Sequence, residues 1–225
     1  MSGQATGRTL LLEARELATL LAGCGIEGLY MPALVSQAVV AESDVTDSMM
    51  GLVRDGLMTQ AADGLLDYAP DLHEVLLVLR DCSLSVLLWA DWLGDEPRYL
   101  HLSPGQDAAV EVVDDPLRPG SVRVRLVDLD LWCRALVDAS SQAKVEFVEV
   151  PEALKRGLEV GPVEGRGSLF VAWCFRRGAD RPRQLLRGVR LYSGDALVVH
   201  PRGGNNVIPL DARSLVGLLK EADGK

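Results

Sequence analysis

The sequence predicts an α+β fold: a helical N-terminal region, then two β-meanders, each closed by a helix, that form an antiparallel sheet with packed helices. Over residues 1–82 the apolar side chains recur mainly at helical spacing. From residue 83 onward, short segments alternate apolar and polar residues between turn residues, which is typical of strands. Two such blocks, residues 83–140 and 168–225, show the same order of elements, and residues 141–167 link them.

The first helix is expected over residues 10–22, because leucines and alanines recur there every three or four positions. Gly23 and Gly25 would end it, since glycine readily adopts the left-handed conformation that follows many helices. A second helix is expected over residues 33–40. Both belong to the helical region of residues 1–82.

A third helix is expected to start near residue 44, with Thr46 or Asp47 as its N-cap, and to stop at Gly56. Residues 57–68 then predict a short hairpin. A helix followed directly by a hairpin is how many winged-helix domains end, so this part of the chain is expected to be winged-helix-like.

The first strand block follows a helix that Pro70 opens, since proline fits the first position of a helix, where no backbone N–H is needed. The inward face of this helix is expected to consist of Leu72, Val75, Leu76 and Leu79. The strands of the block are expected at residues 83–92, 98–102, 108–113 and 122–127. Asp128 would then cap a helix that runs to about residue 137.

The second strand block repeats this order. The link before it predicts a short strand, a proline-opened helix and a glycine-rich segment, at residues 144–150, 151–158 and 161–167. The strands of the second block are expected at residues 168–177, 184–192, 196–200 and 206–210. Asp211 would cap a final helix to about residue 221.

An internal repeat would explain the similar blocks. Trp89 lies 39 residues before Asp128, and Trp173 lies 38 residues before Asp211. A four-stranded meander with one helix covers only one face of its sheet and leaves its edge strands unpaired. Two copies could pair into one continuous sheet or pack around a pseudo-twofold axis. We therefore expect a duplication, with chance similarity as the alternative.

The composition indicates an acidic globular protein of the cytosol. The 225 residues carry a formal net charge of −9, which disfavours nucleic acid as a partner. The start of the chain predicts no signal peptide, and no apolar run is long enough for a membrane span. One basic cluster, which could bind an anion or an acidic partner but is more simply a solvated strand edge, consists of Arg176, Arg177, Arg181, Arg183, Arg187 and Arg190.

Residues with catalytic potential are scattered along the sequence. The three histidines, His73, His101 and His200, fall on separate elements without metal-ligand spacing. The four cysteines are far apart in apolar settings, which predicts buried free thiols. The glycine-rich spots lack phosphate-loop spacing. We therefore expect no enzyme, no cofactor and no metal, although an unrecognised catalytic type stays open.

Aromatic residues on the strands are the candidates for partner binding. Trp89 and Trp92 are three positions apart, so in a regular strand they face opposite sides of the sheet, and one of them could be exposed. Exposed strand aromatics are common in binding sites, although core packing explains each one singly. The predicted partner-binding residues are Trp89, Trp92, Trp173 and Phe175.

The overall layout resembles EspG, the bacterial cytoplasmic chaperones associated with type VII (ESX) secretion. The segments that carry the resemblance are ELATLLAGCG at 16–25, MPAL at 31–34, LVRDGL at 52–57 and PDLHEVLLVL at 70–79, followed by the two strand blocks. The resemblance implies a duplicated α+β fold and binding of a secreted helical protein, which the chaperone keeps soluble. A homodimer is also possible under this hypothesis.

The alternative hypothesis is a regulator derived from a winged-helix domain, which would bind DNA or sense a ligand. DNA recognition needs arginine, lysine, asparagine or glutamine on the recognition helix. The helix expected from residue 44 carries Arg54 as its one basic residue. The sequence therefore favours a protein-binding chaperone or adaptor over a DNA-binding regulator.

Overall fold

The structure of this chain is a computed structural model. It describes residues 8–38, 42–60, 65–89, 97–103, 106–142, 170–177, 184–191, 195–199, 205–209 and 211–220, and for strands β8, β9 and β10 it describes the backbone alone. The strands are β1 (Leu10–Glu13), β2 (Met58–Gln60), β3 (Leu66–Tyr68), β4 (Leu84–Trp89), β5 (Arg98–Leu102), β6 (Ala108–Asp114), β7 (Ser121–Asp128), β8 (Phe170–Arg176), β9 (Gln184–Leu191), β10 (Asp195–Val199) and β11 (Asn205–Pro209). The helices are α1 (Ala14–Gly23), α2 (Ala33–Ser36), α3 (Glu42–Arg54), α4 (Pro70–Asp81), α5 (Leu129–Gln142) and α7 (Ala212–Lys220).

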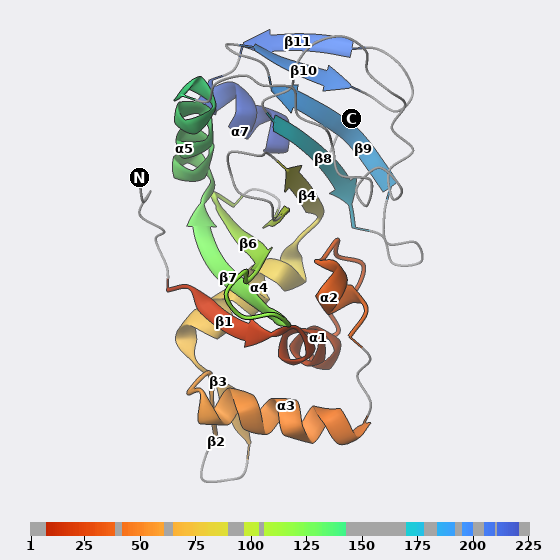
Figure 1. The fold of residues 1–225 in the computed structure, drawn as a ribbon, viewed down its shortest axis with the longest axis vertical. Coiled ribbons are helices and arrows are strands. Elements are labelled where there is room, and N and C mark those ends of the chain that lie inside the picture. Colours follow the sequence, from red (N-terminus) through yellow and green to blue (C-terminus); the bar gives the residue numbers. More distant parts are fainter. Residues whose placement is uncertain are drawn as a thin grey trace.

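The fold is α+β, as the sequence predicted. Within the described residues, nine strands form one antiparallel sheet in the order β1-β7-β6-β5-β4-β8-β9-β10-β11, and β2 and β3 form a separate hairpin. Figure 1 shows α5 and α7 together beside the sheet, while α1, α2 and α3 gather at the opposite end of the molecule from the last strands. One group of helices therefore consists of α5 and α7, and the other consists of α1, α2 and α3.

Two four-stranded meanders make up most of the sheet. Strands β4 to β7 precede α5, strands β8 to β11 precede α7, and the meanders join where β4 pairs antiparallel with β8. The carboxylates of Asp128 and Asp211 each accept a hydrogen bond of 2.8 Å from the backbone N–H three residues further on. The predicted order of elements and both caps are confirmed, and the duplication of the sequence stays a prediction.

Alternate residues of the central strands point to opposite faces and enter two separate cores. On one face, Leu87 and Val112 pack with residues of α1, α3 and α4. On the other face, Val86 and Leu100 pack with residues of α5 and α7, such as Leu218. The predicted inward residues of α4, namely Leu72, Val75, Leu76 and Leu79, are all buried, which confirms that prediction.

The prediction of a helix from residue 10 was wrong for its first turn. Residues 10–13 form the edge strand β1, in which Leu10 lies opposite Val124 of β7. Leu10 and Leu12 are buried and their neighbours are more exposed, which is the period of a strand. So short an apolar run fits both periods, and pairing with β7 satisfies its backbone groups. The helix itself begins at Ala14.

Three other boundaries differ from the predictions. Helix α3 begins at Glu42, so Thr46 and Asp47 lie inside it and do not cap it. Its predicted end is confirmed, because Gly56 has a φ of 71°, which favours glycine. Helix α2 is shorter than predicted and α5 is longer. Terminal turns depend on local packing, which sequence periodicity does not encode.

The N-terminal hairpin is confirmed, with Met58 opposite Tyr68, and its turn at 61–64 lies outside the described residues. The short strand, helix and glycine-rich segment predicted at 144–150, 151–158 and 161–167 also lie outside them.

Candidate functional site

A buried carboxylate marks the candidate site. Glu111 lies in the middle of β6, where its neighbours are apolar and its side chain is only 2% exposed. The sheet register places it opposite Leu100 of β5 on one side and Arg125 of β7 on the other. An ionised carboxylate so far from water needs charged partners to remain stable.

Two arginines and a tryptophan hold Glu111. Arg98 Nη1 donates to Oε1 at 3.0 Å, and Arg125 Nε donates to Oε2. Trp132 Nε1, from α5, donates to Oε1 at 3.2 Å. Burial raises the pKa of Glu111, but the hydrogen bond and charge of Arg125, the charge of Arg98 and the indole N–H outweigh it, so the pKa lies below its usual value. Glu111 is therefore a fixed negative charge at neutral pH.

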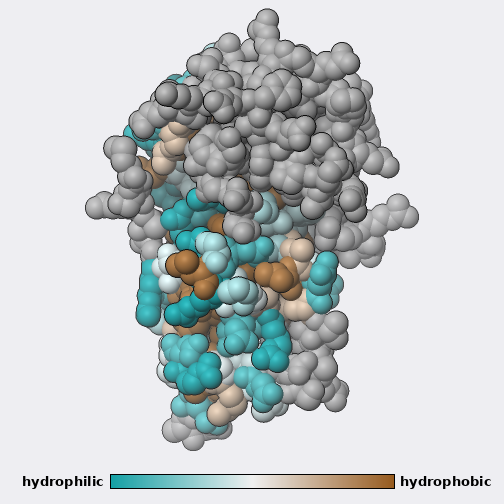
Figure 2. Space-filling view, in the orientation of Figure 1, coloured by the Kyte–Doolittle hydropathy of each residue, from teal (hydrophilic) through white to brown (hydrophobic). Residues whose placement is uncertain are grey.

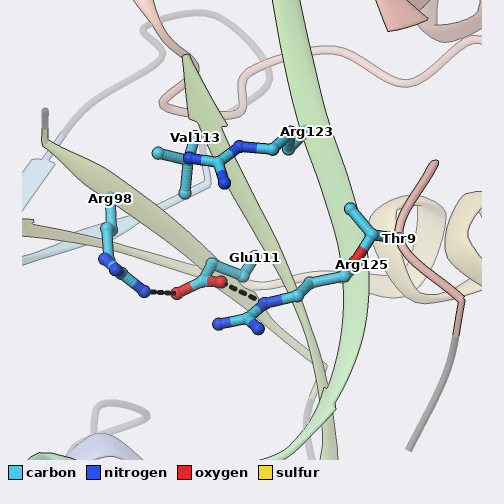
Figure 3. A pocket seen from close by; sticks show the side chains of 6 residues that line it. All are labelled: Thr9, Arg98, Glu111, Val113, Arg123 and Arg125. Atoms are coloured by element: carbon cyan, nitrogen blue, oxygen red, sulfur yellow. Dashed lines mark hydrogen bonds and ion pairs between the residues drawn. The ribbon is translucent and has the colours of Figure 1, made fainter. Parts of the chain in front are cut away.

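A hollow of about 120 Å³ opens beside this ion-pair cluster. Its lining residues are Thr9, Arg98, Glu111, Val113, Arg123 and Arg125. Figure 3 shows Arg98 and Arg125 converging on Glu111 from either side, while Arg123 extends above them next to Val113. Three guanidinium groups against one carboxylate leave the hollow with a local charge of about +2.

Strand alternation and the position of α5 explain why the hollow forms. Arg123 and Arg125 are two positions apart on β7, so they share the sheet face that carries Glu111. Further along the same face, Ala109 and Val127 are covered by the core that includes α5 and α7. The arginines occupy the part of the face beyond that core, where charged groups keep access to water.

Arg123 differs from the other two arginines of the hollow. Its side chain is exposed, and within the described part of the chain it makes neither a hydrogen bond nor an ion pair. Arg98 and Arg125 keep only 25% and 29% of their side-chain surface exposed. Arg123 is therefore the guanidinium of the hollow that can take up an external anion with the least rearrangement.

The sequence predictions missed this cluster, although two signals for it were present. One was the Val-Arg-Val-Arg-Leu alternation at 122–126, which places two cations on one face. The other was a single glutamate within the apolar strand around Glu111. The third arginine, Arg98, comes from a different strand, so only the pairing of β5 with β6 brings it close.

His101 is held in a structural position. It has no exposed surface, and its Nδ1 lies 3.0 Å from Ser85 Oγ, which in turn accepts a hydrogen bond from the Tyr30 backbone N–H. Burial lowers the pKa of His101 to about 3, so the ring is neutral at physiological pH. The prediction of a satisfied structural histidine agrees with the Ser85 contact at Nδ1, while Nε2 has no hydrogen-bond partner among the residues that the structure describes.

The prediction of buried free thiols is confirmed for Cys82 and Cys133. Cys24 is also free but is only partly buried. Burial raises the pKa of Cys82 to about 11 and that of Cys133 to about 12, so both remain thiols at neutral pH. The side chain of Cys174 lies outside the described residues.

The predicted partner-binding residues are described only in part. Trp89, Trp173 and Phe175 lie on the paired strands β4 and β8, where Trp89 is opposite Val171, Trp173 opposite Leu87 and Phe175 opposite Ser85. The register therefore brings three of the four positions together in two adjacent central strands. Their side chains lie outside what the structure describes, and so does Trp92 as a whole.

Arg177, a member of the basic cluster predicted from the sequence, has a structural role. Its guanidinium donates to the backbone carbonyls of Glu27 and Arg80, each at 2.6 Å, and also reaches those of Leu79 and Cys82 at 3.4 Å. A cation at the C-terminus of α4 also interacts favourably with the helix dipole. The other arginine side chains of that cluster lie outside the described residues.

The surface of the described residues is mainly polar on the face drawn in Figure 2, where hydrophobic side chains are scattered among hydrophilic ones. Among the described residues, no group of three metal-ligating side chains comes together. In the same residues, no helix is long and apolar enough to cross a membrane. No protein-family model and no curated protein matches this chain.

Proposed function

We propose that this protein is a non-catalytic chaperone or adaptor that binds another protein. The partner would be a small, secreted helical protein kept soluble in a type VII-like pathway, as the resemblance to EspG implies. The observation that carries the proposal is the pairing of β4 with β8, which sets Trp89, Trp173 and Phe175 in adjacent central strands. Aromatic residues that cluster in this way are frequent anchors of protein interfaces.

The buried titratable groups described above fit a binding protein. His101 is neutral and enclosed, and Glu111 is engaged by two arginines. An amphipathic helix that docks on the aromatic positions would need only apolar contacts from them, which is the helix-in-groove mode of recognition.

Affinity capture from the native cells tests this proposal. The tagged chain should retain a small helical protein in stoichiometric amount, and Trp89→Ala or Trp173→Ala should release it. Trp132→Ala is the matched control, because Trp132 lies on α5 and bonds Glu111 on the other face of the sheet. The unfolding temperature of each variant, measured in parallel, separates loss of binding from loss of the fold.

Two outcomes would contradict the proposal. If the chain is recovered alone or only with copies of itself, it does not act as a chaperone for another protein. If Trp89→Ala and Trp173→Ala lower the unfolding temperature but keep the partner, the aromatic residues are core residues and the interface lies elsewhere.

A DNA-binding regulator is the competing proposal, and the arrangement of α3 before the β2–β3 hairpin favours it. The charge of α3 argues against it, because its one basic residue, Arg54, already pairs with Asp55 at 3.0 Å. Fluorescence anisotropy with a random DNA duplex at low salt distinguishes the two. Binding that weakens steeply with salt would support the regulator.

A further inference from the structure

We infer that the hollow beside Glu111 is a binding site for a carboxylate group, with Arg123 as the residue that receives it and Arg98 and Arg125 as its electrostatic support. The inference rests on a feature separate from the aromatic positions of β4 and β8. Arg98 lies opposite Leu88 in the register, whereas Trp173 lies opposite Leu87, so the two features belong to different faces of the sheet.

The charge of the hollow indicates an anionic ligand. The residues that line the hollow include three arginines and one carboxylate, that of Glu111, which its lowered pKa keeps ionised, so the net charge of the lining is near +2 at neutral pH. The chain as a whole carries a net charge of −9. A local positive site on an acidic molecule attracts a single anionic group but is a poor site for a polyanion such as nucleic acid.

The geometry narrows the ligand to a small group. At about 120 Å³ the hollow is smaller than the pockets that hold drug-sized ligands or cofactors, which span roughly 300–1,000 Å³. Guanidinium groups bind carboxylates through charge-assisted N–H donors, and this hollow already holds one carboxylate, that of Glu111, through one N–H from Arg98 and one from Arg125. A second carboxylate fits beside Arg123, whose donors face the hollow (Figure 3).

Carboxylate is favoured over phosphate because of the donors that are open to a ligand. Arg98 and Arg125 already donate to Glu111, so Arg123 is the arginine of the hollow that offers its guanidinium to a ligand within the described residues. One guanidinium matches the two oxygens of a carboxylate, whereas a phosphate group presents more acceptor oxygens than Arg123 alone can serve. Two sources share this chemistry, namely a free small carboxylic acid and the acidic side chain of a protein segment.

The test is a titration of the ¹⁵N-labelled protein, followed through the arginine Nε–Hε signals. The probes are acetate, N-acetylglutamate N-methylamide, its glutamine analogue and inorganic phosphate. Acetate and the glutamate probe should shift the signals of the hollow saturably, whereas the uncharged glutamine probe should not. Tighter binding of the glutamate probe than of acetate indicates a protein side chain as the source, and equal binding indicates a free acid.

Arg123→Gln should weaken binding of the glutamate probe by about tenfold or more, because one charge-assisted hydrogen bond is removed. Arg118→Gln is the matched control, since it removes the same charge from the exposed loop that joins β6 to β7. Arg123 is itself exposed, so both variants are expected to unfold at the temperature of the parent protein.

The inference is overturned if the signals do not shift, if phosphate binds more tightly than the glutamate probe, or if Arg118→Gln weakens binding as much as Arg123→Gln. The assay uses the isolated protein and small probes. Its result is therefore independent of the capture experiment, and either idea can fail while the other stands.

Discussion

At the scale of single residues, buried polar groups make the stability of the fold depend on pH. The pKa of His101 falls from 6.5 to about 3 on burial, so the unfolded chain binds a proton at this histidine between those values and the folded chain does not. The free energy of unfolding therefore does not depend on His101 above about pH 6.5. It decreases as the pH falls from 6.5 toward 3, because only the unfolded chain takes up the proton. Glu111, whose pKa is lowered, adds a further loss only below its unfolded pKa of 4.5.

His101→Asn should flatten this pH dependence. An asparagine can still hydrogen-bond Ser85 but takes up no proton, so the free energy of unfolding should change by about 2 kcal/mol less between pH 6.5 and 5 than in the parent. Urea unfolding at both pH values measures the difference. Equal slopes in the parent protein and in His101→Asn would contradict the prediction.

Gly51 lies so close to Glu16 that a side chain at position 51 would clash with it. A Cβ atom at this position would lie 2.3 Å from Glu16 Oε1, and Glu16 is buried and accepts a hydrogen bond from the Glu13 N–H at 2.9 Å. Gly51→Ala should force the Glu16 carboxylate to move and break its hydrogen bond to the Glu13 N–H. This loss should exceed the gain of about 0.5–1 kcal/mol that alanine brings inside a helix, so the free energy of unfolding should fall by about 1 kcal/mol.

Gly217→Ala on α7 is the matched control for Gly51→Ala. Nothing lies within 4 Å of a Cβ atom there, so alanine should stabilise the helix by about 0.5–1 kcal/mol. Thermal and urea unfolding of both variants check the opposite signs. If Gly51→Ala also stabilises the protein, then α1 and α3 do not pack as closely as described.

At the scale of elements, sequence patterns were informative where one period dominated. The alternating strands of both meanders and the proline-opened α4 were predictable because their patterns had one interpretation. Residues 10–13 were ambiguous, since so few leucines fit a helix and a strand equally well. They form a strand because they pair with β7, the last strand of the first meander. The ion-pair cluster could not be predicted for the same reason, because Arg98 meets Glu111 only after β5 and β6 pair.

Arg177 joins elements that are distant in the sequence. It follows β8 and donates to the last carbonyls of α4 and to Glu27, so it ties the second meander to the N-terminal helices. Arg177→Gln should lower the free energy of unfolding by about 1–3 kcal/mol, since hydrogen bonds to charged groups contribute that much. Arg177→Lys should restore part of the loss.

Urea unfolding measures this effect, with Arg80→Gln as the control. Arg80 is exposed and pairs with Asp81 on the surface of α4, where an ion pair contributes little. Equal losses for Arg177→Gln and Arg80→Gln would show that the carbonyl contacts of Arg177 do not hold the meander in place.

At the scale of the whole molecule, the central claim is that this protein acts by binding another protein. Its wide antiparallel sheet brings candidate aromatic positions together at the β4–β8 junction and carries an arginine-lined hollow on the other face. The α+β class was predictable from the sequence, because helical spacing over residues 1–82 gives way to strand alternation from residue 83 onward. The hollow was not predictable from the sequence, since its position depends on how much of the sheet face α5 covers.

Native mass spectrometry of the protein, isolated gently from its own cells, tests this claim most directly. The account predicts a dominant mass equal to the chain plus one small second polypeptide in fixed stoichiometry, with free chain as a minor species. A spectrum that contains only the chain, or whole-number multiples of it, would contradict the account and shift the search to a ligand-binding or enzymatic role.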